Sequence, residues 1–252
     1  MRTLAPDVKG VTTQPEGASI AFLLVHGFCA APDEVTPLGE YLAKMNIASF
    51  AIEIVGHAGS NVDIRETTWQ DWFSCVKHGY DLVKSWGTKY VLVAGLSMGG
   101  AASALLASQE SEIDGLVLMA PALRIDGILP KLIPILKYFM KDREIDVEKA
   151  QEVYDLKRTK CGVEPLSAYH ELLRFQKQVR RHLSDVTIPT LVLQGTDDKT
   201  INPNNGQLAL ELIGSQDKTL HIIEGGEHVL TCHRTRVTTF PLIKEFIERI
   251  TG

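Results

Sequence analysis

The sequence has few cysteines, no long apolar run and no surplus of positive charge. Its four cysteines are too scattered for a zinc or C-x-x-C redox site, so we expect free thiols in a reducing compartment. No apolar stretch is long enough to span a bilayer, and residues 1–17 lack the apolar core of a signal peptide. These absences predict a cytoplasmic protein without an integral membrane segment. The net charge of −5 makes nucleic acid an unexpected partner.

The apolar content, in contrast, is ample for a core: 44% of the 252 residues are hydrophobic, with no internal repeat or low-complexity tract. Short β-branched runs predict six buried strands, at residues 20–25, 48–54, 90–94, 115–119, 190–193 and 219–223. Segments of helical length separate most of them, at residues 33–45, 67–86, 101–109, 166–183 and 205–213, with a last one ending near Ile250. This alternation predicts an α/β fold with a mostly parallel sheet of about six to seven strands and helices on both faces. Pro241 is expected to kink or divide the last helix.

The alternation breaks once, after Pro121, where nearly seventy residues precede the next strand. We predict a core made of residues 1–121 and 166–252, with a small helical cap at 122–165. An apolar stripe at helical spacing runs through this cap, at Leu129, Leu132, Ile133, Leu136, Phe139 and Met140. We expect Leu129, Ile133 and Leu136 to line a substrate cleft. Ordinary packing is the simpler interpretation of the stripe, and transient contact with a lipid interface is an alternative, in which Lys131, Lys137 and Lys141 could equally form a solvated face.

Gly95-Leu96-Ser97-Met98-Gly99 lies between a predicted strand and a predicted helix, as a nucleophile elbow does. Such an elbow holds a serine on a sharp turn, and small flanking residues let the backbone bend. A G-x-S-x-G match alone occurs easily by chance. Its placement therefore carries the prediction that Ser97 is a nucleophile.

A serine nucleophile needs a histidine base and an acid that orients it. Asp197 and Asp198 follow the predicted strand at 190–193, and His228 follows the one at 219–223 behind two glycines. The order Ser, Asp, His is that of α/β-hydrolases. One of the two aspartates is expected to serve only its turn, and His233 is a weaker rival to His228.

An acyl-transfer site also needs backbone N–H groups that stabilise an oxyanion. The residue after the nucleophile supplies one of them, which is Met98. Phe28, after the strand at 20–25, is expected to supply the other. His26 in the same loop is expected to shape it rather than to transfer protons.

The segments LLVHGF, GLSMGG, LQGTDDKTIN and SQDKTLHIIEGGEHVL together resemble those of α/β-hydrolase carboxylesterases and monoacylglycerol lipases. The resemblance runs from about Ala21 to the C-terminus and implies the α/β-hydrolase fold. The family's Gly-x-x-Asp-x-x-apolar pattern matches Asp198 rather than Asp197. Gly56-His57-Ala58-Gly59-Ser60 departs at Ala58 from the family's Gly-His-Gly-x-Ser, and we interpret His57 as structural. The family's first antiparallel strands are expected to be short or missing.

The sequence thus predicts a serine carboxylic-ester hydrolase that forms an acyl-enzyme on short- to medium-chain esters or monoacylglycerols. Ser97, Asp198 and His228 would be catalytic, with the N–H groups of Phe28 and Met98 as the oxyanion hole. The reaction needs no metal or organic cofactor. A thioesterase with the same triad and a non-catalytic binding protein on a hydrolase scaffold are the alternatives. The sequence leaves the oligomeric state open.

Overall fold

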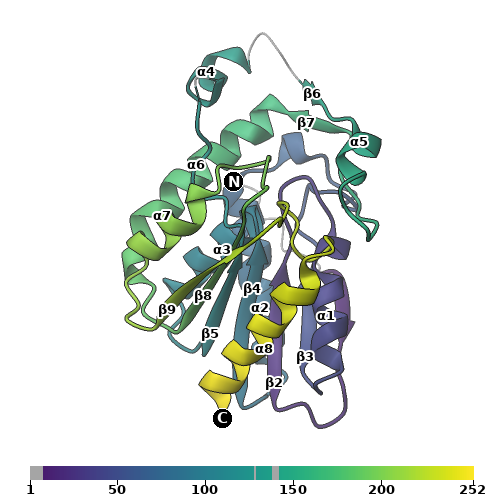
Figure 1. Cartoon of the computed structure of the whole chain (residues 1–252). Coiled ribbons are helices and arrows are strands. Elements are labelled where there is room, and N and C mark those ends of the chain that lie inside the picture. Colours follow the sequence, from purple (N-terminus) through teal and green to yellow (C-terminus); the bar gives the residue numbers. More distant parts are fainter. Residues whose placement is uncertain (1–7, 128, 138–141) are drawn as a thin grey trace.

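The computed structural model describes residues 8–127, 129–137 and 142–252. A seven-stranded sheet with the order β1-β3-β2-β4-β5-β8-β9 forms the centre of the molecule (Figure 1). All neighbouring strands are parallel except β1, which pairs antiparallel with β3. The strands are β1 (Gly10–Thr13), β2 (Ile20–Val25), β3 (Ala48–Ile52), β4 (Tyr90–Leu96), β5 (Gly115–Met119), β8 (Thr190–Gly195) and β9 (Lys218–Ile223). The predicted α/β fold with a mostly parallel sheet is confirmed.

Helices cover both faces of this sheet. They are α1 (Thr36–Ala43), α2 (Trp69–Lys84), α3 (Met98–Ala107), α4 (Leu129–Leu136), α5 (Val147–Gln151), α6 (Leu166–His182), α7 (Asn204–Leu212) and α8 (Arg236–Thr251). Three short 3-10 turns add η1 (Pro32–Glu34), η2 (Ile64–Glu66) and η3 (Leu183–Asp185). A separate antiparallel pair, β6 (Asp142–Glu144) and β7 (Val163–Pro165), lies outside the main sheet.

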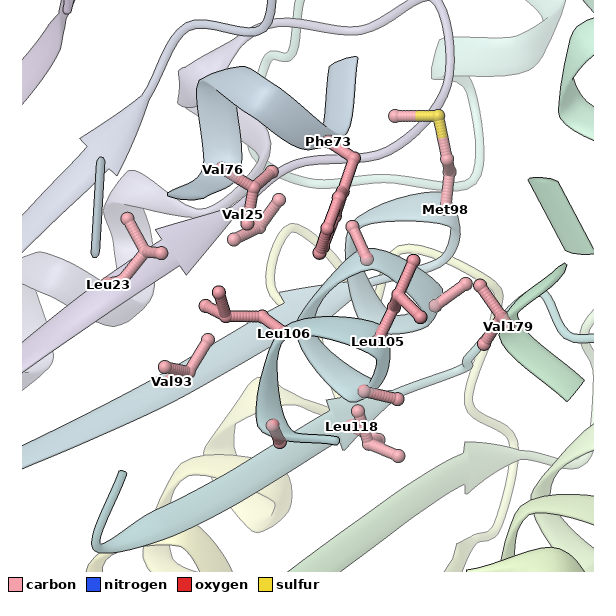
Figure 2. Packing of buried hydrophobic residues seen from close by; sticks show 14 of the residues in the cluster. Leu23, Val25, Phe73, Val76, Val93, Met98, Leu105, Leu106, Leu118 and Val179 are labelled. Carbon is pink, nitrogen blue, oxygen red and sulfur yellow. The ribbon is translucent and has the colours of Figure 1, made fainter. Parts of the chain in front are cut away.

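Strand side chains alternate between two apolar layers because successive residues of a strand point to opposite faces. In β2, Leu23 and Val25 pack with α2, α3 and α6, whereas Phe22 and Leu24 pack with α1 and α8. Figure 2 shows part of the first layer around α3. Helix α3 is buried along its whole length, since the sheet covers one side of it and α6 packs on the other. This packing also holds the elbow around Ser97, at the first turn of α3, in place.

Pro241 does not divide the last helix. Helix α8 runs without interruption from Arg236 to Thr251 with Pro241 inside it. A proline leaves the carbonyl four residues earlier without its helical partner. That residue is Val237, which is 72% exposed, so water can donate to the carbonyl. The prediction that Pro241 divides this helix was therefore wrong, because a hydrogen bond lost at an exposed position is not enough to end the helix; the alternative, a kink, stays a prediction.

The segment between β5 and α6 contains α4, β6, α5 and β7, which gather at the top of Figure 1. Phe139 and Met140 of the predicted stripe lie outside the described residues. Within the described residues, a four-residue strand, β1, precedes β2, and the expectation of short or missing first strands stays a prediction. All four cysteines are free thiols, as predicted.

Candidate active site

Ser97 occupies a sharp turn between β4 and α3. Its backbone has φ 57° and ψ −118°, a strained conformation that is rare for a residue with a side chain. A Cβ atom at Gly95 would lie 2.2 Å from the Gly99 carbonyl oxygen, and one at Gly99 would lie 2.2 Å from the Val25 carbonyl oxygen. Only glycine fits these two positions, so the elbow pattern has a steric cause. The turn presents the Ser97 hydroxyl at the end of the sheet.

The structure brings Ser97, His228 and Asp198 into one hydrogen-bonded chain. His228 Nε2 lies 2.8 Å from Ser97 Oγ, and His228 Nδ1 lies 2.7 Å from Asp198 Oδ2. Since an ionised carboxylate only accepts hydrogen bonds, Nδ1 carries the ring proton and donates a hydrogen bond to Asp198. Nε2 is then the acceptor for the Ser97 hydroxyl. This is the geometry that a general base needs to deprotonate a serine.

Asp198 is fixed from both sides. Its Oδ1 accepts the backbone N–H groups of Thr200 at 2.9 Å and Ile201 at 3.0 Å, while its Oδ2 also accepts Gln194 Nε2 at 3.1 Å. Burial raises the pKa of Asp198, but the hydrogen bond and charge of His228, together with the two N–H bonds, outweigh it and hold the pKa below its usual value. The carboxylate therefore stays ionised at neutral pH.

Asp197 and His233, the two alternatives considered from the sequence, are not part of this hydrogen-bonded network. Asp197 is exposed, and its Oδ1 accepts the hydroxyl of Thr196 at 2.9 Å. His233 bonds the Thr235 hydroxyl at 2.9 Å instead of Ser97. Among the two aspartates and two histidines considered from the sequence, the geometry joins Asp198 and His228 to the serine.

The loop after β2 passes close to Ser97. A Cβ atom at Gly27 would lie 3.5 Å from the Ser97 Cβ. Phe28 and Met98 line the same cleft as Ser97 and His228. His26 Nδ1 donates to the Gly27 carbonyl at 2.9 Å, and its Nε2 accepts the Ile54 N–H at 3.2 Å. Burial lowers the pKa of His26, so the ring is neutral, and its hydrogen bonds connect this loop to the segment that follows β3.

Residues 17–234 match the Hydrolase_4 family, described as serine aminopeptidase, S33. The chain belongs to this family of serine hydrolases. It is 27% identical over 225 residues to the thermostable monoacylglycerol lipase of Bacillus sp. (strain H-257), covering 86% of this chain and 85% of that protein. It is also 27% identical over 248 residues to the carboxylesterase of Bacillus subtilis (strain 168), covering 96% and 99%. These relatives confirm the resemblance predicted from the motifs.

A solved structure reported with LipS and LipT, two metagenome-derived lipolytic enzymes, superposes on this hydrolase with a TM-score of 0.86. It covers 94% of this chain and 97% of that one at 24% identity. At this level of identity the likeness concerns the fold. The α/β-hydrolase fold implied by the motifs is thereby confirmed.

A cleft of about 280 Å³ opens above Ser97 in this serine hydrolase. Its apolar wall comes from the elbow, the segment after β5, helix α6 and the loop after β8, through Met98, Ile125, Leu172 and Ile201. Its polar wall comes mainly from residues 143–169. No pattern in the sequence marks that wall, because most of its residues belong to short elements without apolar periodicity.

The three residues expected to line the cleft belong to α4. Ile133 is buried and Leu136 is half-buried, and neither is among the residues that line the cleft. Leu129 begins α4, and its side chain lies outside the described part of the structure. Helix α4 packs against α6. Ile125 and Leu172 line the cleft in place of these α4 residues.

His57, which the sequence suggested to be structural, is fully enclosed. Its Nδ1 lies 3.2 Å from the Val55 carbonyl, and its ring meets Phe28 and Trp72 edge to face at 5.7 and 5.2 Å between centroids. Burial, followed by the nearby His26, lowers the pKa of His57 well below its usual value. The neutral ring of His57 thus packs against the ring of Phe28.

Glu34 connects three parts of the site, a role that the sequence did not suggest. Its Oε2 accepts the Gly27 N–H at 3.2 Å, and its Oε1 accepts Arg158 Nη1 at 2.8 Å. Its backbone carbonyl accepts the Thr231 hydroxyl in the loop that carries His228. Both charged side chains of the pair are buried. Glu34 therefore positions the loop of Phe28 relative to Arg158 and His228.

Replacing Arg158 with methionine is expected to destabilise the fold by about 3–5 kcal/mol, because the Glu34 carboxylate would stay buried without its charged partner. The ring of Tyr154, 4.6 Å from the Arg158 guanidinium carbon, would also lose its cation. Urea unfolding monitored by circular dichroism measures this change.

Two further variants serve as controls for this prediction. Lys244→Met removes an exposed pair with Glu248 on α8 and should leave the free energy of unfolding almost unchanged. The double variant Glu34→Gln/Arg158→Met removes both charges and should be more stable than Arg158→Met alone. If Arg158→Met and Lys244→Met cost the same, the buried pair does not hold the loop in the way inferred here.

Within the described residues, no group of three or more histidine, cysteine, aspartate or glutamate side chains is placed to hold a metal ion. No helix in that part of the chain is long and apolar enough to cross a membrane.

Proposed function

We propose that this serine hydrolase cleaves carboxylic esters through an acyl-enzyme formed on Ser97. The hydrogen-bonded chain from Ser97 through His228 to Asp198 is the observation that carries the proposal. A serine hydroxyl is a poor nucleophile until a base removes its proton, and His228 Nε2 lies at the distance required. The names of the relatives, monoacylglycerol lipase and carboxylesterase, support the same reaction.

In the proposed reaction, Ser97 Oγ attacks the ester carbonyl while His228 Nε2 takes its proton. The backbone N–H groups of Phe28 and Met98 donate to the oxyanion, and each such donor contributes about 3–4 kcal/mol in enzymes where one was removed. His228 then protonates the leaving alcohol, and the acyl group remains on Ser97. A water molecule, deprotonated by His228, attacks this acyl-enzyme and releases the acid. Asp198 holds the imidazole in the required tautomer throughout.

For the substrate we propose short- to medium-chain acyl esters or monoacylglycerols. The apolar wall formed by Met98, Ile125 and Leu172 suits an acyl chain, and a cleft of about 280 Å³ limits its length. We further propose that residues 122–165 act as a cap over Ser97, since Ile145 and Tyr154 of this segment line the cleft. The free thiols fit a cytoplasmic location.

Hydrolysis of 4-nitrophenyl esters from acetyl to hexadecanoyl tests this function. We expect kcat/KM to rise from acetyl to a maximum at short or medium chains and then to fall as the chain outgrows the cleft. A series in which acetyl is fastest and every longer ester is slower would contradict the acyl pocket. A protein that hydrolyses thioesters but no oxygen esters would contradict the proposed reaction class.

A further inference from the structure

The cleft above Ser97 carries more positive than negative side chains, although the whole chain has a net charge of −5. Six ionisable Lys, Arg and Glu side chains line it. They are the cations Arg143, Arg158, Lys160 and Lys199 and the carboxylates Glu34 and Glu164. The surplus is local to the site and runs against the charge of the molecule. The chemistry of the ligand that the cleft binds must explain this local surplus of positive charge.

Ion pairing neutralises only part of this charge. Arg158 and Glu34 form a buried ion pair, with 2.8 Å between Arg158 Nη1 and Glu34 Oε1. Lys160 and Arg143 share one carboxylate, because Glu164 lies 2.8 Å from Lys160 Nζ and 3.6 Å from Arg143 Nη1. At 3.6 Å the guanidinium is too far for a hydrogen bond. The Arg143 side chain is 59% exposed, so its guanidinium group is accessible to solvent or to a ligand.

Lys199 brings a second cation from another part of the chain. It directly follows Asp198, its side chain is 82% exposed, and its Nζ lies 3.5 Å from Glu227 Oε1. Glu227 does not line the cleft. Even with Glu227 included, four cations face three carboxylates. Arg143 on β6 and Lys199 after β8 are the two whose charges are least neutralised.

A neutral ester gives these two cations nothing to bind, and an acyl chain laid against them would displace their water at a cost. An anionic group would instead form charge-assisted hydrogen bonds, for which the fork of a guanidinium is well shaped. The low-dielectric walls of a cleft strengthen such attraction. We propose that the preferred ester carries an anionic group, a carboxylate or a phosphate, that Arg143 and Lys199 bind. This inference rests on the ester hydrolysis proposed above.

Two pairs of substrates test this inference at low ionic strength. The first compares 4-nitrophenyl pentanoate with mono-4-nitrophenyl glutarate, which has the same chain length and a terminal carboxylate. The second compares 1-butanoylglycerol with 1-butanoylglycerol 3-phosphate. We expect kcat/KM to favour the anionic member of at least one pair by about 3- to 10-fold, as for partly exposed charge contacts. The pair that shows the preference tells carboxylate from phosphate.

The double variant Arg143→Gln/Lys199→Gln should bring that ratio close to 1. Arg124→Gln is the matched control, because Arg124 is a half-exposed arginine paired with Asp126 that does not line the cleft, and it should keep the ratio. In the unmodified protein, 0.5 M salt should also shrink the preference, which gives a readout that does not depend on how the variants fold.

A preference for the neutral ester in both pairs would overturn the inference. So would an anionic preference that the double variant leaves unchanged. Hydrolysis of the neutral esters without an anionic preference would refute this inference alone. Failure to hydrolyse any of the four esters would refute the proposed function as well.

Discussion

Ser97→Ala is expected to lower kcat for aryl esters on the order of 10⁴-fold or more. The loss should be this large because, in the proposed reaction, the hydroxyl forms the covalent bond to the acyl group, and neither His228 nor the proposed oxyanion donors can replace it. Alanine can occupy the same strained turn, since only the hydroxyl is removed and the glycines around it are unchanged. Substrate binding should therefore be little affected. Steady-state kinetics with 4-nitrophenyl butanoate, and circular dichroism to verify folding, measure the effect.

Ser103→Ala is the matched control for this variant. Ser103 lies on the same helix, and its buried hydroxyl has no hydrogen-bond partner among the described residues. Its removal should change kcat less than about twofold, because no catalytic contact is lost. Residual activity of Ser97→Ala within tenfold of the unmodified protein would mean that another group is the nucleophile.

Asp198→Asn is expected to lower kcat by about 10²- to 10⁴-fold while the protein stays folded. An asparagine presents an amide where the carboxylate accepted the hydrogen bond from His228 Nδ1–H, so the imidazole loses its orienting partner and favours the wrong tautomer. It also stabilises the developing imidazolium less well. KM should change far less than kcat, since the carboxylate is buried behind His228 and does not reach the substrate.

Asp197→Asn provides the comparison one residue away. Asp197 is exposed, and among the described residues its side chain accepts a hydrogen bond from Thr196 and none from His228, so its variant should keep kcat within about twofold. The two variants make the same chemical change in the same loop. Equal losses in both would show that the loop conformation, rather than the contact with His228, controls the rate.

The main sheet and the Ser97 site could be predicted from the sequence because each part has a local signal. A buried parallel strand is a short apolar run, and the elbow is a glycine pattern with a steric cause at Gly95 and Gly99. The carboxyl ends of parallel strands meet at one edge of a sheet, which places residues from separate loops together. Ser97 and His228 therefore followed from strand order and the glycine patterns beside them, whereas the choice of Asp198 over Asp197 rested on the resemblance to the family.

The polar wall of the cleft could not be predicted in the same way. Strand β6 has only three residues, all exposed, and carries no alternation of apolar and polar side chains. The pair of Glu34 with Arg158 joins positions 124 residues apart, and no pattern near either residue marks it. The burial of a charged side chain depends on its partner, so a single sequence does not reveal it.

The most direct test of the account is covalent labelling with a fluorophosphonate, followed by peptide mapping. The phosphorus takes the place of the ester carbonyl, so only a serine that His228 activates should react quickly. We predict one phosphonyl group per chain, located on Ser97, with loss of esterase activity in proportion to labelling and no labelling of Ser97→Ala. Labelling of a different residue, or equal labelling of the Ser97→Ala protein, would contradict the assignment of Ser97 as the nucleophile.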